Sequence, residues 1–486
     1  MSPARTIAVV GGGFAGTLTA IHLIRSAAMI AEMRVVLINR TATIGPGVAY
    51  SVSSPALLLN VPAARMSALP DDPDHFLRWA RTRLGPAVAG DAFLPRGLYG
   101  AYLSELFEDA CGRAARGALR CVRAAAIDVE ADSQPVVTLS DGQRVAAERV
   151  VMARGHSLPR HPPVAAGTEF YRSRRYLRTP WSSAGLDAVE RDADVLLIGS
   201  GLTMYDVVLL LRERGHRGTI LVLSRSGLMP RCHAPRPLAL RGGPSAQAWL
   251  RIPPTAGSLL RAVRAAAVST AEPTDWRAVI DSLRPVTAAL WQRLPAREQQ
   301  RFVLRLRPYW EVHRHRAAVE VHRRISALVA DGLLRLHRGQ VRAWREDGAG
   351  VTAELGGGTG LRVGYVVNCT GPDTDVQRSD DPLVRSLLAR GLIVRDRLGL
   401  GIETAADGAV IDAGGRASSW LYTLGTWRKP ALWESVAVPE LRIQAADLAQ
   451  RLTHDLPADA LPVQDGRRYA FSCRGGVPGR QHDWNG

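Results

Sequence analysis

Residues 11–16 read GGGFAG, directly after the apolar run Ile7–Val10 and directly before residues with apolar side chains at helical spacing. In such a strand–turn–helix unit, Gly11 permits the tight turn, Gly13 lets the backbone approach a pyrophosphate, and Gly16 lets the helix pack closely on the strand. The N-terminus of the helix adds unpaired N–H groups and partial positive charge. The segment therefore predicts a dinucleotide-binding βαβ unit.

This first unit is expected to run from a strand at Thr6–Val10, through a helix over 14–30, to a strand at Arg34–Ile38. The residue after the second strand is usually acidic and holds a ribose hydroxyl, but here it is Asn39, which can bond a hydroxyl without charge. Arg40 suits a phosphate, although a solvated side chain is the simpler interpretation. The residues expected at this nucleotide are Gly11, Gly13, Phe14, Ala15, Gly16, Asn39 and Arg40.

A second, imperfect copy follows at residues 199–204, GSGLTM, between an apolar run and another helical pattern. Met204 replaces the glycine that packs helix against strand, which predicts a slightly wider spacing without loss of phosphate binding. The next strand ends at Ser224 and Arg225 with no carboxylate, and an arginine there favours the 2′-phosphate of NADP. The alternative is that Arg225 is an exposed arginine in an arginine-rich chain. The residues expected at this nucleotide are Gly199, Gly201, Leu202, Thr203, Ser224 and Arg225.

Both halves of the chain share one order of elements, in which the glycine turn is followed by a hairpin and a buried strand that ends in glycine, Gly155 or Gly371. The predicted fold class is therefore α/β, with two Rossmann-like domains and a helical insertion in the second. The expected divisions are a first FAD-binding part at 1–165, an NAD(P)H-binding domain at 190–365 with the insertion at about 235–330, a second FAD-binding part at 366–455, and an irregular tail at 456–486.

The composition argues against a nucleic-acid-binding protein, a membrane protein and a disulfide-rich protein. The net charge is +17, but Lys429 is the only lysine and the arginines are scattered, so no basic patch predicts nucleic-acid binding. No run of about 18 apolar residues predicts a membrane span, and no signal peptide is recognised, which favours the cytoplasm. Five cysteines without a CxxC pair argue against a disulfide framework, a zinc site or a dithiol centre, and no metal is expected.

Two dinucleotide loops in one chain predict electron transfer between two bound nucleotides. The economical assignment places FAD at the first loop and NADPH at the second, because a permanently bound flavin can receive electrons from a nucleotide that comes and goes. A looser second loop is compatible with such a transient ligand. The remaining partners would be a small-molecule substrate and molecular oxygen, and the oligomeric state stays open, a homo-oligomer included.

With these residues the chain resembles the YdhS-like FAD/NAD(P)-binding proteins, which are similar to the flavin-containing and N-hydroxylating monooxygenases. The resemblance reaches to about residue 450. Ten segments carry it together: GGGFAG, GPGVAY, LLLNVPAARMS, PDDPDHFLRW, LPRGLYGAYL, VLLIGSGLTMYDVVLLL, LSRSGLMP, VHRHR, VVNCTGP and WESVAVPELRIQA.

The resemblance implies further positions around the flavin. GHSLP, beginning at Gly155, and CTGP, beginning at Cys369, stand where such proteins cross between domains. Gly425 and the helix that begins near Pro439 resemble the C-terminal FAD segment, where a helix N-terminus would stabilise negative charge on the reduced ring. Asn60 and Met66 lie in a segment that would approach the ring, or pack as an ordinary loop. Trp433 either lines the site or packs.

The implied activity is a flavoprotein monooxygenase in which NADPH reduces FAD and an oxygen adduct at C4a transfers one oxygen atom to a small molecule, N-hydroxylation included. The Baeyer–Villiger pattern is matched only at Phe170 and Pro180, since Arg172 and Tyr176 replace its glycine and histidine. The alternatives are an NADPH-dependent reductase without oxygen insertion, and a non-catalytic FAD-binding sensor in which the second loop would be idle. Catalysis would be flavin-borne, and the substrate stays unnamed.

The motif HRHR at 313–316 lies in the predicted insertion. Histidines two residues apart point to different helix faces, which argues against a shared metal. His313 with Arg316 could hold a substrate carboxylate or phosphate, whereas a solvated helix face is the simpler interpretation. Asp206, near the start of the second helix, is expected to stabilise the helix dipole.

Overall fold

The computed structural model describes residues 5–27, 33–131, 133–181, 185–235, 244–268 and 276–454. The predicted tail at 456–486 lies outside these residues, as do two short parts of the predicted insertion, 236–243 and 269–275. Within the described residues, no helix is both long enough and apolar enough to cross a membrane.

The first sheet has six strands in the order β16-β17-β7-β1-β2-β3, all parallel except β16. The strands are β1 (Arg5–Val10), β2 (Met33–Asn39), β3 (Leu119–Arg123), β7 (Arg149–Met152), β16 (Ala409–Ile411) and β17 (Ala417–Thr423). Residues 7–10 are fully or almost fully buried, as expected for the centre of a sheet covered on both faces. The sheet therefore combines strands from both ends of the chain, so this Rossmann-type unit is discontinuous.

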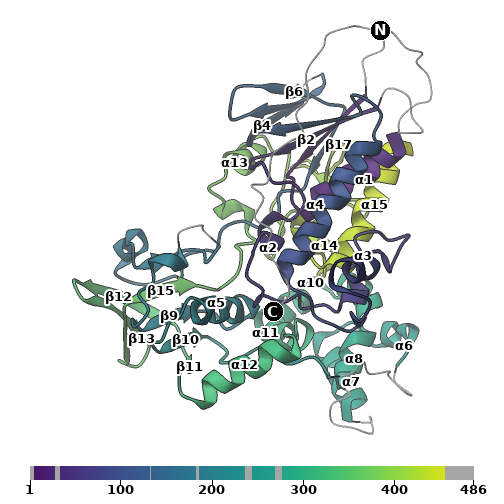
Figure 1. Cartoon of the computed structure of the whole chain (residues 1–486). Coiled ribbons are helices and arrows are strands. Elements are labelled where there is room, and N and C mark those ends of the chain that lie inside the picture. Colours follow the sequence, from purple (N-terminus) through teal and green to yellow (C-terminus); the bar gives the residue numbers. More distant parts are fainter. Residues whose placement is uncertain are drawn as a thin grey trace.

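Helices from both ends of the chain pack on the first sheet. The helices are α1 (Phe14–Ala27), α2 (Gly47–Tyr50), α3 (His75–Leu84), α4 (Arg96–Arg113) and α15 (Val438–His454). Figure 1 shows α1, α4 and α15 side by side over this part of the molecule, and α1 and α15 make the most extensive contact between helices. Tyr99 and Tyr102 of α4 are fully buried in this core, and the ring of Phe76 in α3 packs against both.

The second sheet is wholly parallel, with five strands in the order β11-β10-β9-β15-β8. Its strands are β8 (Tyr176–Leu177), β9 (Val195–Ile198), β10 (Ile220–Ser224), β11 (Leu334–Arg338) and β15 (Tyr365–Asn368). The helices α5 (Leu202–Glu213) and α12 (Val319–Ala330) contact each other on this sheet. The two Rossmann-type sheets confirm the predicted fold class.

In each half of the chain a three-stranded antiparallel sheet comes directly before the strand that leads into the crossover, which is β7 in the first unit and β15 in the second. The first contains β4 (Ala126–Ala131), β5 (Pro135–Leu139) and β6 (Arg144–Ala146), and the second contains β12 (Val341–Asp347), β13 (Gly350–Leu355) and β14 (Gly360–Val363). Gly142 has a positive φ of 83° at the first hairpin turn, as the Asp-Gly pair predicts. The internal repeat is therefore present in the structure.

Between β10 and β11 the chain forms a group of helices, which Figure 1 shows below the first sheet. They are α6 (Ala246–Arg251), α7 (Ala256–Val268), α8 (Trp276–Ser282), α9 (Thr287–Arg293), α10 (Ala296–Arg301) and α11 (Arg307–Arg314), followed by α12. Trp249 is fully buried among them. Pro295 precedes α10 and Pro308 lies in the first turn of α11, where proline is compatible with a helix. The helical insertion is where the sequence predicts it, whereas the residue limits of the domains stay a prediction.

The first glycine turn predicts a stability difference between two Gly→Ala variants. A Cβ at Gly16 would lie 1.8 Å from the carbonyl oxygen of Gly11, whereas a Cβ at Gly201 has no atom within 4 Å. We expect Gly16→Ala to lower the free energy of unfolding by about 1–3 kcal/mol, because the helix must move away from the turn. Gly201→Ala is the matched control and should leave it nearly unchanged. Urea unfolding followed by circular dichroism measures both, and equal losses would contradict this account.

Candidate functional site: two nucleotide loops and the junction between them

The first glycine turn joins β1 to α1 and admits no side chain at its two ends. Gly11 has a φ of +112°, and a Cβ there would lie 2.3 Å from the carbonyl oxygen of Ala153. At Gly16 a Cβ would meet the Gly11 carbonyl. At Gly13 a Cβ would have only the Cα of Gly47 nearby, at 3.6 Å, so this face of the loop is open. The free N–H groups of the first turn of α1, at Phe14 and Ala15, can therefore receive an anion.

Asn39 contacts the loop itself. Its Oδ1 accepts a hydrogen bond from the Gly12 N–H at 3.1 Å, and its Nδ2 donates to the carbonyl oxygens of Thr41 and Thr43, both at 2.9 Å. The amide thus fixes the glycine turn to the end of β2. These bonds already engage the donor and the acceptor of the Asn39 side chain. Its expected contact with a ribose hydroxyl stays a prediction. Arg40 is exposed beside it.

The first crossover meets the C-terminal segment. The Thr426 hydroxyl donates to the Gly155 carbonyl at 2.8 Å, and the Gly425 N–H donates to the Gln444 side chain in α15 at 3.1 Å. Pro439 lies in the first turn of α15. The C-terminal segment at Gly425 is therefore adjacent to the first crossover and to α15, and the expected flavin contacts of Gly155, Gly425 and Pro439 stay a prediction.

Arg154, immediately before Gly155 at the first crossover, makes a structural contact. Its guanidinium pairs with Asp381 at 2.5 Å and lies 5.7 Å from the centre of the Trp427 ring. Close to it in sequence, His156 is an exposed residue, and desolvation together with the charge of Lys429 lowers its pKa to about 4. His156 is therefore neutral at physiological pH.

The second glycine turn repeats the geometry of the first. Gly199 has a φ of +104°, and a Cβ there would lie 2.6 Å from the carbonyl oxygen of Cys369. Gly201 faces open space, and α5 begins at Leu202, with Thr203 next in its first turn. Met204 is fully buried in the core. Since the equivalent position in the first loop has no room for even a methyl group, α5 leaves space at this point that α1 does not.

Asp206 does not act at the helix terminus. Because α5 begins at Leu202, Asp206 lies beyond the first turn, which contains no acidic residue. It is buried and pairs with Arg96 of α4 at 2.7 Å, and Arg96 also donates to the Leu58 carbonyl at 3.0 Å. The expected interaction with the helix dipole is therefore wrong, and the ion pair instead joins the two Rossmann-type units.

A basic hollow lies at the end of β10, where the sequence places Ser224 and Arg225. Ser224 interacts with the hydroxyl of Ser226. The hollow has a volume of about 390 Å³, and its lining residues are Arg225, Arg338, Gly339, Gln340, Arg342 and Gly356. No carboxylate lines it, and none of its three arginines forms an ion pair within the described part of the chain. Sequence reasoning missed Arg338, because only the parallel pairing of β10 with β11 brings it beside the end of β10, and it missed Arg342, which follows in β12.

A second hollow lies where the first unit, the helical insertion and the start of α15 meet. Asn60 and Arg65 line it from the first unit, and Arg314 and Arg316 line it from the end of α11. The carbonyl of Asn60 accepts a hydrogen bond from His233 Nε2 at 3.0 Å. The sequence alone singles out Asn60 and Arg316 but not their proximity.

His313 is not part of this second hollow. The helix α11 ends at Arg314, so Arg316 lies beyond it and the helical spacing used to pair His313 with Arg316 is wrong. His313 Nδ1 contacts the Tyr309 carbonyl at 2.7 Å, and its ring packs edge-on against Trp276. Arg316 is 4% exposed and pairs with Asp281 at 2.5 Å.

Met66 and Trp433 both pack in the protein interior. Met66 is 2% exposed in the core of the first unit. Trp433 has a φ of +60°, the only non-glycine residue with positive φ in the described chain, and its ring contacts Trp291 and Phe302 of the insertion. Next to it, Glu434 accepts a hydrogen bond from Trp310 at 2.9 Å. These contacts support the packing interpretation for both residues.

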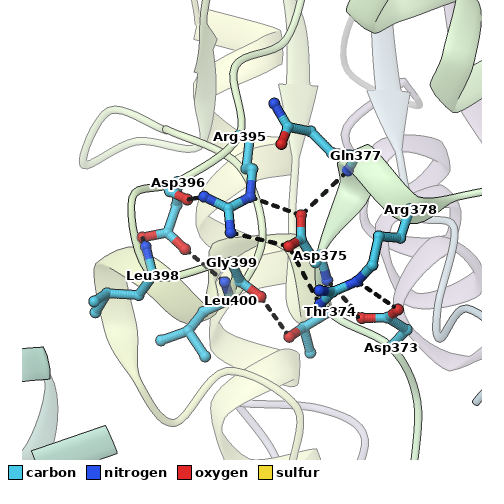
Figure 2. Close-up of polar contacts among 10 residues, drawn as sticks. All are labelled: Asp373, Thr374, Asp375, Gln377, Arg378, Arg395, Asp396, Leu398, Gly399 and Leu400. Carbon is cyan, nitrogen blue, oxygen red and sulfur yellow. Dashed lines mark hydrogen bonds and ion pairs between the residues drawn. The ribbon is translucent and has the colours of Figure 1, made fainter. Parts of the chain in front are cut away.

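An ionic network around the buried carboxylate of Asp375 holds the loop after the second crossover. Figure 2 shows Arg395 between Asp375 and the loop at 396–400, with bonds of 2.7 and 2.9 Å to the two carboxylate oxygens of Asp375. Arg378 contacts the same carboxylate at 3.2 Å. The loop then presents Leu400 to Trp291 and Trp433 in one apolar cluster. The network thereby ties the helical insertion to the first unit.

The first Rossmann-type unit matches a known protein family. Residues 8–157, which contain the first glycine turn and β7, match a family model described as FAD-NAD(P)-binding. No curated protein sequence matches the chain.

Solved structures match almost the whole chain. Ornithine hydroxylase (PvdA) from Pseudomonas aeruginosa is similar with a TM-score of 0.61 at 13% identity, over 93% of this chain and 99% of that one. L-lysine 6-monooxygenase from Pseudomonas syringae gives 0.61 at 15%, over 93% and 99%. Ornithine N-hydroxylase from Kutzneria sp. 744, solved with reduced FAD, NADP⁺ and L-ornithine, gives 0.56 at 15%, over 93% and 99%. These similarities show a shared fold.

The environment of His233 predicts an acid sensitivity of the fold. Desolvation, with the charge of Arg316, lowers the pKa of His233 from 6.5 to about 4. The folded protein therefore keeps this side chain neutral while the unfolded chain protonates it, so stability is complete above pH 6.5 and is lost as the pH falls towards 4. His233→Gln should reduce the loss of stability between pH 7 and pH 5 by about 1–2 kcal/mol.

Urea unfolding at the two pH values measures this difference. His454→Gln, at the exposed end of α15, is the matched control for removal of a histidine. Equal acid sensitivity of the wild type and His233→Gln would contradict the prediction.

Proposed function

We propose that the protein is an FAD-dependent, NADPH-using oxidoreductase that acts as a monooxygenase on a small molecule. The observation that carries the proposal is the pair of glycine turns at the carboxyl edges of two parallel sheets, each closed against the carbonyl of a crossover segment. The FAD-NAD(P)-binding match over the first turn supports a flavin there. The shared fold with three amino-acid hydroxylating enzymes supports the oxygenase activity.

The residues around the first turn fit FAD. Backbone N–H groups of residues 13–16 would bind the pyrophosphate, because the missing Cβ atoms of Gly11 and Gly16 bring helix and turn together and Gly13 leaves the approach open. Asn39 and Arg40 would lie near the ribose. Gly155, Gly425 and the N-terminus of α15 at Pro439 would lie along the ring, where the helix dipole stabilises negative charge.

The second turn and the basic hollow fit NADPH. Gly199, Gly201, Leu202 and Thr203 would present N–H groups to the pyrophosphate in the same way. Ser224 and Arg225 stand at the end of β10, where a 2′-phosphate binds in this fold, and Arg338 and Arg342 add two more unpaired guanidinium groups. NADH carries no such phosphate, so this charge favours NADPH.

When bound, the flavin would supply electron transfer from NADPH and the activation of oxygen. The chain's own residues would then position the substrate and limit water. His156, being neutral, would exchange hydrogen bonds beside Gly155 without adding charge. Lys429 lies 3.9 Å from Glu311, and burial lowers its pKa. The contacts of Trp433 with Trp291 and Phe302 would close this space on the side of the insertion.

The cysteines within the described chain do not support a reductase that uses a dithiol. Cys232 and Cys369 are free, and burial raises the pKa of the Cys369 thiol well above its usual range. A buried thiol held protonated is a poor nucleophile. This leaves oxygen, rather than a disulfide, as the electron acceptor that the site fits better.

The fate of oxygen tests the proposed activity. The purified protein with its flavin would be supplied with NADPH and labelled oxygen gas, together with panels of amines, ketones, sulfides and carboxylic acids. A monooxygenase must place labelled oxygen in an organic product, whereas a reductase would consume NADPH and release hydrogen peroxide alone. NADPH consumption without a labelled product from any panel would favour the reductase, and no consumption would favour the sensor.

Arg225 and Arg338 should determine the nucleotide preference. Arg225→Ala and Arg338→Ala should each raise the KM for NADPH about tenfold or more, because each removes a charge-assisted bond to the 2′-phosphate, and should leave the KM for NADH nearly unchanged. Steady-state kinetics with both nucleotides measures this. Arg116→Ala, an exposed arginine after α4, is the matched control. Parallel changes for NADPH and NADH would contradict the assignment.

Several finer points complete the proposal and rest mainly on the sequence. They are membership of the YdhS-like group, a cytoplasmic location, a substrate small enough to enter between the units, and FAD-binding parts at 1–165 and 366–455 around an NADPH-binding domain at 190–365. A homo-oligomer is compatible with them.

A further inference from the structure

The second hollow collects positive charge from separate parts of the chain. Four arginines line it, namely Arg65, Arg284, Arg314 and Arg316, and Asp281 is the only carboxylate among its lining residues. Arg65 comes from the first unit, and the other three come from the helical insertion. Because Arg65 is far from the other three in sequence, only the docking of the insertion on the first unit assembles the four.

Two of these guanidinium groups are buried without full hydrogen bonding. Arg316 is 4% exposed and gives one nitrogen to Asp281, while its Nε has no hydrogen-bond partner in the protein. Arg314 is 9% exposed, and its Nε and one Nη have none. The nearest carboxylates to Arg314, Glu434 and Glu440, are 3.8 Å away, which is beyond hydrogen-bond distance. Buried charged donors without acceptors are costly, and they indicate that an acceptor is missing.

The other lining groups do not provide that acceptor. Arg284 is held by Glu440, with bonds of 2.7 and 3.1 Å, so that carboxylate is already engaged. Arg65 is exposed and forms no ion pair within the described residues. His233 uses Nε2 on the Asn60 carbonyl, and its low pKa makes it neutral. Arg65 has no counterion within the described residues, and Arg314 and Arg316 keep buried N–H donors without acceptors, so the hollow is suited to an anion.

The position of the hollow connects it to the proposed chemistry. Asn60 and Ala437 line it, and both belong to segments that would approach the flavin, since Ala437 immediately precedes α15. The arginines expected at the 2′-phosphate of NADPH belong to a different hollow, beside β10. An anion bound at Arg314 and Arg316 would therefore be a part of the substrate rather than of the nucleotide.

We propose that this hollow holds the oxyanion head of the substrate, a carboxylate or a phosphate, and that Arg65, Arg314 and Arg316 are the residues that bind it. The inference rests on the proposed function, because it treats the hollow as the substrate side of a flavin site. It also names a substrate class, a small organic anion, and it excludes diamines, because a dication would meet a lining with four arginines and one carboxylate. Guanidinium groups suit oxyanions through charge-assisted and bidentate bonds.

Binding of probes to the flavin-containing protein tests the proposal without NADPH or turnover. Glutarate and cadaverine are matched five-carbon probes of opposite charge, and inorganic phosphate tests the second kind of oxyanion. Isothermal titration calorimetry would be performed with wild type, Arg65→Ala, Arg316→Gln and the control Arg116→Ala, each with and without saturating NADP⁺. Arg65 is exposed, so its variant should fold even if Arg316→Gln does not.

We expect glutarate or phosphate to bind and cadaverine not to bind. Arg316→Gln should weaken the anion about tenfold or more and Arg65→Ala about threefold to tenfold, whereas Arg116→Ala should have no effect. Tighter binding of glutarate than of phosphate assigns a carboxylate head, and the reverse assigns a phosphate. Absence of anion binding, equal binding by the Arg65 variant and the wild type, tighter binding of cadaverine, or loss of glutarate and phosphate binding on saturation with NADP⁺ would overturn the proposal. Because no turnover is measured, none of these results depends on whether NADPH reduces the flavin.

Discussion

The structure depends on a steric constraint that occurs twice, a glycine turn pressed against the carbonyl of a crossover segment. At Gly11 and Gly199 the backbone has positive φ, and the space of a Cβ is already filled by the carbonyl oxygen of Ala153 or Cys369. Any side chain would push the turn away from the crossover. The constraint therefore fixes where the first helix of each unit begins, and it points the N-terminus of that helix at the edge of the sheet where ligands bind in open parallel sheets.

Ion pairs between the two units and the helical insertion hold them in one arrangement. The buried pair of Arg96 and Asp206 joins α4 to α5. Arg284 and Glu440 join the insertion to α15, and the Asp375 network orders the loop that supports Trp433. Removing one partner of such a pair leaves an uncompensated buried charge, which is costly. Function thus depends on these contacts indirectly, because they set the distance between the two glycine turns.

Much of the fold follows from local pattern, and much of the site does not. The glycine turns, the Asp141–Gly142 hairpin and the strands that flank the turns could be predicted because each depends on neighbouring residues. Arg225 could be placed by its position after a strand. Arg338 could not, because it reaches Arg225 through the pairing of two strands that the whole helical insertion separates in sequence. His313 and Arg316 were paired by an assumed helix that in fact ends at Arg314, and Asp206 was assigned to a helix terminus that lies further upstream.

The central claim is that one chain binds two different nucleotides and passes electrons between them. The most direct measurement is an anaerobic titration of the purified protein with NADPH, followed by the visible absorbance of its bound flavin. The account predicts that flavin copurifies with the protein. About one equivalent of NADPH should remove the visible absorbance of the oxidised flavin, because NADPH donates two electrons and FAD accepts two. A protein without flavin, or a flavin whose absorbance does not change with NADPH, would contradict the account.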